Sequence, residues 1–246
     1  MARDLYVAWQ DQASRTWHTI ARLRRTGDEY EFVFTRGVKR LSSIPLDLFR
    51  MDVTKRYRST ELTPLFRNRL LSRSRKDFSK ISHWLNLRGD ESDFDLLSKF
   101  GLIPGTDSIL IYPSPETQEN QYFIEFFVHG IRHMSADMVT QCDQVIEGAR
   151  LLPLLDVQNP IDPNAIALRA EDDTRLMGYM PAFYASDIRS ILSDAQSAKS
   201  ARITVVRNNK DAPIQLRLLC RFQATVTEDF LSLNTDVHRP LLEEAA

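Results

Sequence analysis

Hydrophobic positions near the start of the chain fall in short runs that are typical of β-strands. The runs at 5–9, 16–23 and 30–34 are rich in aromatic and β-branched residues, and polar turn residues separate them. This spacing predicts an antiparallel meander. Residues 42–48, which include a proline, are expected to end the sheet.

After residue 60 the hydrophobic period changes to that of helices. Apolar residues recur at helical spacing over 62–71, 78–85 and 94–100, and Ser92 or Asp93 is placed to cap the third helix. A strand is expected at 109–112. The first half is therefore predicted to be a small antiparallel sheet with helices.

A polar stretch separates this half from the next. Residues 114–121 contain one proline among polar residues and are predicted to link two domains. The predicted domains are 1–114 and 121–235, followed by an acidic tail at 236–246.

The strongest local signal of the second half is the turn-forming run Asn-Pro-Ile-Asp-Pro-Asn-Ala-Ile at 159–166. Proline fixes φ, and Asn and Asp side chains accept hydrogen bonds from nearby amides, so the run predicts a rigid loop. A strand at 165–168, a turn at 170–174 and a returning strand at 175–180 predict a hairpin. Helical spacing over 184–192 predicts a short helix after it.

Composition narrows the class of protein. The 246 residues carry a net charge of −1, so the chain as a whole is not basic and its overall charge does not favour nucleic-acid binding. Cys142 and Cys220 lack metal-ligand spacing and suit a reducing compartment, and Cys220 is expected in the core. Without a long apolar run or a secretion signal, a cytoplasmic protein without membrane contact is expected.

Positive charge is concentrated between residues 50 and 80, where ten basic residues accompany three acidic ones. The ten are Arg50, Lys55, Arg56, Arg58, Arg67, Arg69, Arg73, Arg75, Lys76 and Lys80. Arg67, Arg69, Arg73, Arg75 and Lys76 interleave with apolar positions and could follow a phosphate backbone. The alternative is a solvated face, or one balanced by an acidic partner.

The loop at 159–166, with Gly-Tyr-Met-Pro at 178–181, Ala185 and Gly-Ile-Arg at 130–132, resembles the HIRAN domain. This family occurs in DNA-repair helicase-like proteins and alone in bacteria. The resemblance covers about residues 121–235. It implies an α+β chain whose second half is an OB-like β-barrel with short helices.

The resemblance also implies a ligand, because eukaryotic relatives capture the 3′ end of single-stranded DNA. Stacking accepts any base, and a carboxylate can accept a hydrogen bond from a free 3′-hydroxyl. For this chain, the resemblance implies that Arg132 contacts a phosphate or a base. It also implies that Asn159 and Asp162 hold the 3′ end of the DNA and that Tyr179 stacks on a base. His133 follows the arginine and offers a partial substitute for a stacking ring.

This chain departs from the end-binding pattern at three positions. The relatives have two tyrosines where His133 and Met134 stand, and another where Ile161 stands. Each lost stack removes about 1 to 3 kcal/mol of binding free energy. Asn159 and Asp162 have a second interpretation, in which they only pin the loop.

Neither a metal site nor a catalytic site is predicted. His129 and His133 stand four residues apart, but at a strand end their side chains diverge. The sequence has no Gly-rich phosphate loop, no helicase motif and no Gly-x-Ser-x-Gly, and the carboxylates at 171–173 are expected at a hairpin tip. No cofactor and no enzymatic activity are expected.

The first half resembles the N-terminal subdomain of HipA-type toxin kinases. The resemblance rests on residues 31–34, on 42–46, and on the helices expected at 64–71 and 93–101. The family's kinase domain is replaced here by the second half, which implies no kinase activity and a docking role for the first half.

Two functions therefore compete. One is a DNA-recognition module whose first half docks a protein partner. The other is a regulatory protein-interaction module, related to toxin–antitoxin systems, that does not bind DNA ends.

Overall fold

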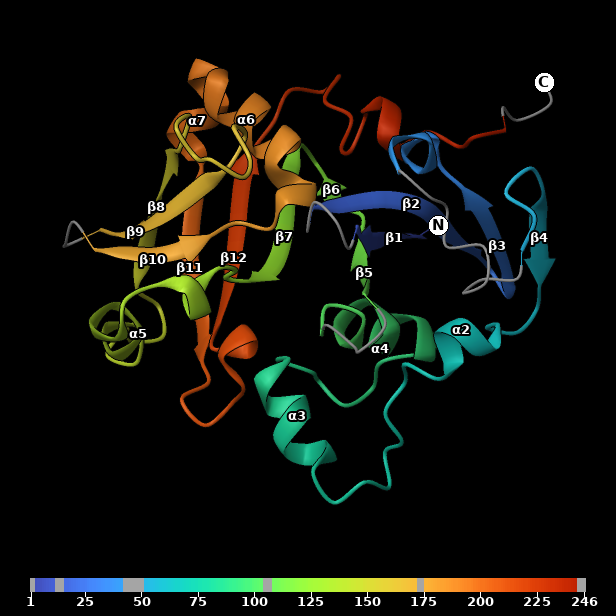
Figure 1. Ribbon diagram of the computed structural model, residues 1–246, viewed down its shortest axis with the longest axis horizontal. Coiled ribbons are helices and arrows are strands. Elements are labelled where there is room, and N and C mark those ends of the chain that lie inside the picture. Colours follow the sequence, from blue (N-terminus) through green and yellow to red (C-terminus); the bar gives the residue numbers. More distant parts are fainter. Residues whose placement is uncertain (1–2, 12–15, 42–50, 104–107, 172–174, 243–246) are drawn as a thin grey trace. The chain divides into compact units, whose positions relative to one another are not determined.

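The computed structural model describes residues 3–11, 16–41, 51–103, 108–171 and 175–242. They form an α+β chain with two antiparallel sheets and short helices (Figure 1). The chain divides into two compact units. The first unit comprises residues 1–79, 88–114 and 234–246, and the second comprises residues 80–87 and 115–233.

The sheet of the first unit has the strand order β4-β3-β2-β1-β5 within the described residues. Its strands are β1 (Arg3–Gln10), β2 (Trp17–Thr26), β3 (Glu29–Phe34), β4 (Arg56–Ser59) and β5 (Ile109–Pro113). The predicted meander of the first three strands is confirmed. Strand β4 lies inside the basic segment, where no strand was predicted. The segment at 42–48, which was expected to end the sheet, lies outside the described residues.

One face of this sheet carries the core of the first unit. Cross-strand pairing places Leu5 opposite Leu23, Leu23 opposite Phe32, and Phe32 opposite Tyr57. Phe66 packs on this row, with its ring centroid 5.8 Å from that of Phe32. Because side chains alternate across a strand, the sequence pattern of β1 to β3 is enough to build this apolar face.

Of the helices predicted in the first unit, one is shorter than its hydrophobic pattern suggests. Helix α2 (Pro64–Arg67) is a single turn, whereas α4 (Asp93–Phe100) spans its predicted range. Ser92 caps α4 in a capping box: its hydroxyl accepts from the Asp95 amide, and the Asp95 carboxylate accepts from the Ser92 amide. No helix in the described parts of the chain combines the length and apolar character needed to span a membrane.

The end of the chain contributes to the first unit. The Leu241 amide donates to the Phe34 carbonyl at 2.8 Å, and Thr35 forms a β-bridge with Pro240. Buried His238 contacts the Tyr112 hydroxyl through Nε2 at 2.9 Å, and burial lowers the pKa of His238 to about 4. Residues 236–242 of the expected tail are therefore packed, and its end, 243–246, lies outside the described residues.

The sheet of the second unit has the strand order β10-β9-β8-β11-β12-β7-β6 in the part that the structure describes. Its strands are β6 (Glu116–Gln118), β7 (Gln121–Phe127), β8 (Arg150–Leu155), β9 (Ile166–Ala170), β10 (Leu176–Tyr179), β11 (Arg202–Asn208) and β12 (Leu218–Thr225). The predicted hairpin of β9 and β10 is present; its tip, 172–174, is not described. The division between the two units falls between Ser114 and Pro115, at the start of the stretch expected to be a linker. Most of that stretch is a hairpin, with Glu119 and Asn120 both at positive φ between β6 and β7.

The expected OB-like barrel is not closed, which corrects that prediction. Strand pairing among the described residues forms an open sheet, with β10 and β6 at its ends. Beyond β7, a single bridge joins His129 to Tyr179 at the end of β10. Gly130 turns the chain immediately afterwards, so the ladder cannot extend along β10 and close the sheet.

Short helices accompany this sheet. They are α5 (Ala136–Cys142), α6 (Ala185–Ser193) and α7 (Ala195–Ser200). The helix predicted over 184–192 is α6, which buries Ile188 and Ile191. Cys220 is fully buried on β12, as expected for a core residue.

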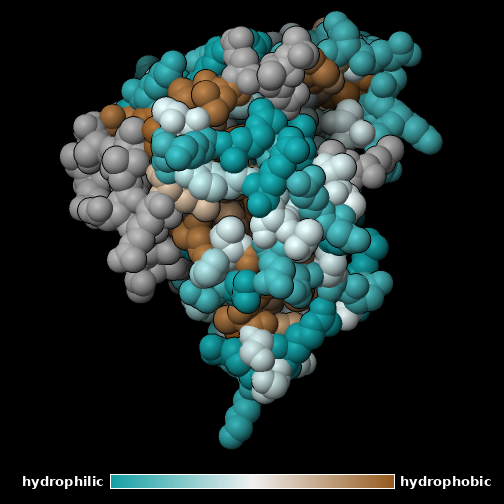
Figure 2. Space-filling view, turned by 90° about the vertical axis from the view of Figure 1, so that its right-hand side faces the viewer, coloured by the Kyte–Doolittle hydropathy of each residue, from teal (hydrophilic) through white to brown (hydrophobic). Residues whose placement is uncertain are grey.

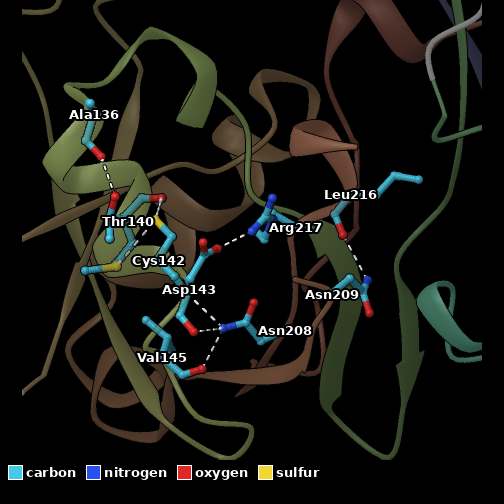
Figure 3. Close-up of polar contacts among 10 residues, drawn as sticks. Ala136, Thr140, Cys142, Asp143, Val145, Asn208, Asn209, Leu216 and Arg217 are labelled. Atoms are coloured by element: carbon cyan, nitrogen blue, oxygen red, sulfur yellow. Dashed lines mark hydrogen bonds and ion pairs between the residues drawn. The ribbon is translucent and has the colours of Figure 1, made fainter. Parts of the chain in front are cut away.

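The hairpin of β11 and β12 holds two neighbouring segments through asparagine side chains. Asn208 Nδ2 donates to the carbonyls of Cys142, Asp143 and Val145, at 2.9, 3.3 and 2.7 Å, where α5 ends (Figure 3). Asn209 Nδ2 donates to the Leu216 carbonyl at 2.9 Å. The last carbonyls of a helix have no amide donor within the helix, so Asn208 supplies hydrogen-bond donors to the carbonyls at the end of α5.

Residues 80–87 precede the linker by some thirty positions but belong to the second unit. They include most of α3 (Phe78–Trp84), a helix predicted at 78–85. Trp84 Nε1 donates to Asp211 Oδ1 at 3.0 Å, and Asn209 Nδ2 donates to the Trp84 carbonyl at 3.0 Å. This segment is therefore fastened to the loop between β11 and β12.

Candidate functional site

Asn159 organises the loop between β8 and β9. Its Oδ1 accepts hydrogen bonds from the amides of Ile161, at 3.0 Å, and Asp162, at 3.1 Å. Its Nδ2 donates to Asp156 Oδ2 at 3.0 Å. All the polar atoms of the Asn159 side chain are thus engaged within the loop, as its turn-forming chemistry predicts.

Only one carboxylate oxygen of Asp162 is hydrogen-bonded within the loop. Its Oδ1 accepts from the Asn164 amide at 2.8 Å, and its carbonyl accepts from the Ala165 amide at 2.9 Å. The second carboxylate oxygen, Oδ2, has no hydrogen-bond partner among the described residues, and the residue is partly exposed. Asp162 therefore pins the turn and still offers one acceptor to a ligand.

Tyr179 joins this loop to the turn that follows β7. Its hydroxyl donates to Asp156 Oδ2 at 3.0 Å, and its backbone exchanges two 2.9 Å hydrogen bonds with His129. A Cβ on Gly130 would lie 3.2 Å from Tyr179 Cδ2, so glycine lets the turn approach the ring. Burial, followed by the hydrogen bond to Asp156, raises the pKa of Tyr179.

The turn itself presents Arg132 and His133 to solvent. Gly130 adopts φ of +79° and starts a 3-10 helix at Ile131–His133. Arg132 Nε donates to His133 Nε2 at 3.0 Å. The structure thus places both predicted residues on one exposed turn, connected to the Asn159 loop through Tyr179.

His129 is placed differently from His133. Its ring stands edge-on to Phe183, with centroids 6.2 Å apart, and burial followed by the charge of Arg132 lowers its pKa to about 4. His129 is therefore neutral at neutral pH. Among the described residues, no group of three His, Cys, Asp or Glu side chains is placed to hold a metal ion.

An aliphatic rim accompanies the loop, and sequence reasoning singled out only Ile161 among its members. Leu154 and Leu155 are each 44% exposed, Val157 is 64% exposed and Ile161 is 73% exposed. Asp156, which binds both Asn159 and Tyr179, was also missed. Its position three residues before Asn159 is a signal that could have revealed it.

The first two arginines predicted in the basic segment make local contacts. Arg67 Nη2 lies 3.3 Å from Glu61 Oε2 and donates to the Leu62 carbonyl at 3.0 Å. Arg69 Nη1 donates to the Ile109 carbonyl at 3.4 Å. Both guanidinium groups are therefore tied to their own unit.

The next three cations differ among themselves. Arg73 donates to the carbonyl of Glu91 at 2.6 Å, and Arg75 makes two 2.8 Å hydrogen bonds to the carboxylate of Asp77. The Asp77 hydrogen bond raises the pKa of Arg75. Lys76 is exposed and makes no ion pair within the described part of the chain.

Strand β4 neutralises part of the remaining charge. Arg56 and Arg58 both reach Glu31 Oε2, at 3.1 and 3.2 Å. The face of the molecule on which β3 and β4 lie is mainly hydrophilic with scattered hydrophobic residues (Figure 2). The segment at 50–80 is therefore less available for phosphate than its composition suggests, and Arg50 falls outside the described residues.

Comparisons with known proteins concern mainly the second unit. Residues 121–227 match the family model of the HIRAN domain. The crystal structure of the HIRAN domain of human HLTF is 15% identical, with a TM-score of 0.34, over 44% of this chain and 78% of that one. The crystal structure of a protein from Lactobacillus plantarum is 16% identical, with a TM-score of 0.31, over 42% and 96%.

A search of curated proteins finds no match. The expected HIRAN domain is confirmed over residues 121–227 by the family match. The resemblance of the first half to HipA-type kinases finds no support among the matches and stays a prediction.

Proposed function

We propose that this protein is a non-catalytic nucleic-acid recognition module. Its HIRAN domain, residues 121–227, binds single-stranded DNA, with a 3′ end held at Arg132, Asn159, Asp162 and Tyr179. The observation that carries this proposal is the partly exposed Asp162, whose Oδ2 has no hydrogen-bond partner among the described residues. A DNA end supplies the donor that this oxygen lacks.

The chemistry of a 3′ end suits this arrangement. A free 3′-hydroxyl can donate to Asp162, whereas a phosphate at the same position would be repelled by the carboxylate. The exposed guanidinium of Arg132 can bind a phosphate oxygen of the same strand. Tyr179 positions the two groups by connecting their loops, and its hydrogen bond to Asp156 holds the ring in place.

The loss of three aromatic rings that stack on bases in the family weakens the expected binding of DNA. At about 1 to 3 kcal/mol per stacked base, replacing the family's tyrosines by His133, Met134 and Ile161 lowers affinity by orders of magnitude. End recognition by this chain therefore depends on hydrogen bonds and charge, and binding is strongly salt-dependent.

Fluorescence anisotropy of labelled oligonucleotides tests the proposal. Single-stranded DNA with a free 3′-hydroxyl is expected to bind more tightly than the same strand with a 3′-phosphate or blunt duplex DNA. Arg132→Ala and Asp162→Ala are expected to weaken binding at least tenfold, and Asp162→Ala to remove the discrimination between the two 3′ ends.

Arg75→Ala provides the control, because Arg75 is already paired with Asp77 in the first unit. The affinity of the Arg75→Ala variant for DNA is expected to match that of the unaltered protein. Failure of every oligonucleotide to bind at moderate salt would reject the proposed function.

A second candidate function is protein docking at the same loop. The aliphatic rim of Leu154, Leu155, Val157 and Ile161 favours it, because these four residues lie within eight positions of the chain and large exposed apolar side chains are typical of protein contacts. In this function the first half, if related to HipA-type subdomains, docks a second protein. A pull-down with Val157→Asp and Ile161→Asp as comparison variants tests it: a partner lost in both variants, together with no DNA affinity, would favour this function.

A further inference from the structure

Three adjacent strands of the second unit present a mixed polar and aromatic surface to solvent. On β7 and β12, buried Tyr122, Ile124, Phe222 and Ala224 alternate with more exposed residues. Alternation puts the latter on the opposite face of the sheet. That face is defined here as the β7-β12-β11 surface, made by Phe123, Arg202, Thr204, Arg221 and Gln223.

Register places these residues side by side across the strands. Phe123 pairs with Gln223, and Gln223 pairs with Arg202. In the next row, Arg221 pairs with Thr204 on one side and with Glu125 on the other. Aromatic, amide, hydroxyl and guanidinium groups thus occupy neighbouring positions on one face of the sheet. The three strands that carry them, β7, β12 and β11, lie side by side in Figure 1.

Arg221 and Phe123 form a preorganised pair. The Arg221 guanidinium carbon lies 5.0 Å from the centroid of the Phe123 ring, and Arg221 Nη2 contacts Glu125 Oε1 at 2.7 Å. The Glu125 side chain is only 8% exposed and holds the arginine over the ring. Flat guanidinium and phenyl groups held in this way are surfaces on which a base can stack.

Arg202 adds positive charge that no acidic side chain neutralises within the described residues. Its Nη1 donates to the carbonyls of Lys199 and Ala201, at 2.8 and 2.7 Å. Backbone carbonyls hold the guanidinium in place without cancelling its charge. Arg202 is exposed beside Gln223, where a phosphate could approach it.

The surface and the candidate site share one strand and its extension. Phe123 and His129, which bridges to Tyr179, are six residues apart on β7 and its extension. At about 3.3 Å per residue they are separated by roughly 20 Å. A strand anchored at Asp162 can therefore reach Phe123 only if it extends several nucleotides beyond its end.

We propose that the β7-β12-β11 surface binds the internal part of a single-stranded nucleic acid, stacking a base on Phe123 and Arg221 and binding a phosphate at Arg202. This inference rests on the proposed function. It adds a second contact with the DNA, one that depends neither on base sequence nor on the 3′ end. The favoured ligand is single-stranded because a duplex hides the faces of its bases.

Oligonucleotide length provides the test in the full chain. Anisotropy is measured with single-stranded DNA of about 4 and about 12 nucleotides, the range of strand lengths that OB-type sites cover. The unaltered protein is expected to bind the longer strand at least tenfold more tightly. Phe123→Leu, which keeps the apolar volume, and Arg202→Gln are expected to remove most of that gain while leaving affinity for the short strand unchanged.

Lys210→Ala is the matched control, because Lys210 is exposed in the loop at the far end of β11. It is expected to keep the full gain with length. Tight binding of both strands that does not change in Phe123→Leu or Arg202→Gln would overturn this inference and leave the proposed function standing. Absence of binding to either strand would reject both, and circular dichroism of the variants verifies that they are folded.

Discussion

The hydroxyl of Tyr179 donates to Oδ2 of Asp156 at 3.0 Å, and this bond connects the two halves of the candidate site. Asp156 belongs to the loop that carries Asn159 and Asp162, whereas the backbone of Tyr179 pairs with His129, next to the turn that carries Arg132. The phenol of Tyr179 therefore adds a side-chain connection between the loop and the turn to the backbone pairing of β9 with β10.

Removal of that hydroxyl tests this dependence. Tyr179→Phe keeps the ring beside Gly130 but loses the hydrogen bond, which lowers the free energy of unfolding by about 1 kcal/mol. Urea denaturation measures it. Asn159 Nδ2 still donates to Asp156, so the loop survives. An unfolding free energy unchanged from that of the unaltered protein would show that the bond does not fasten the loop.

Gly178 is a position where a methyl group cannot be accommodated. Its φ is +130°, and an added Cβ would lie 2.3 Å from Val128 Cγ1 and 2.6 Å from the His129 carbonyl oxygen. Gly178→Ala is expected to lower the unfolding free energy by more than about 3 kcal/mol, because backbone strain and a steric clash combine.

Gly148 separates those two causes. Its φ is +88°, but nothing lies within 4 Å of an added Cβ. Gly148→Ala therefore carries only the backbone strain, about 1 kcal/mol. Thermal and urea unfolding of both variants measures the difference. Equal destabilisation by the two substitutions would contradict the crowding of Gly178 against Val128.

Asp187 makes stability depend on pH. This carboxylate is 4% exposed on α6, accepts from the Leu233 amide at 2.9 Å and contacts the Tyr122 hydroxyl at 3.2 Å. Burial raises its pKa from 3.8 to about 6. The folded protein keeps the proton up to about pH 6, whereas the unfolded chain releases it near pH 3.8. Between these values, stability from this group falls as pH rises.

The stability contributed by this group is expected to fall by about 2 kcal/mol between pH 4 and pH 6, since one pKa unit corresponds to about 1.4 kcal/mol and the unfolded carboxyl is already partly ionised at pH 4. Asp187→Asn does not titrate and is expected to remove this slope. Denaturant unfolding at several pH values in both proteins measures it. Parallel curves for the two proteins would show that Asp187 does not titrate in this range.

Asn208 holds the end of α5 by three donated hydrogen bonds. Asn208→Ala leaves partly buried carbonyls without these donors, and the unfolding free energy is expected to fall by about 2 kcal/mol. Asn208→Asp is expected to cost more, because a carboxylate facing three carbonyls repels them. Hydrogen exchange at residues 139–145 measures the local effect, and unchanged protection there would contradict it.

Patterns that act over a few residues predicted the corresponding parts of the structure. Ser92 caps α4, and Asn159 and Asp162 accept from amides two or three residues ahead, because such contacts need only local backbone geometry. The run of the first three strands follows in the same way from alternation and turns. The same local patterns predicted a HIRAN domain over about residues 121–235, and the family model matches residues 121–227.

Contacts between distant segments could not be predicted from local patterns. The pairing of Arg56 and Arg58 with Glu31 depends on a strand that lies inside an apparent basic run. The inclusion of residues 80–87 in the second unit and of 236–242 in the first depends on packing across more than a hundred positions. The open sheet likewise results from where the chain turns at Gly130.

The sequence by itself therefore determined the first three strands, the hairpin of β9 and β10, the capped helix and the rigid loop, since each is stabilised by neighbours along the chain. Only the tertiary structure decided which charges are neutralised, which segments complete each unit, and that Tyr179 joins Asp156 to the turn bearing Arg132. These outcomes depend on burial and on partners far apart in sequence, and no local periodicity encodes them.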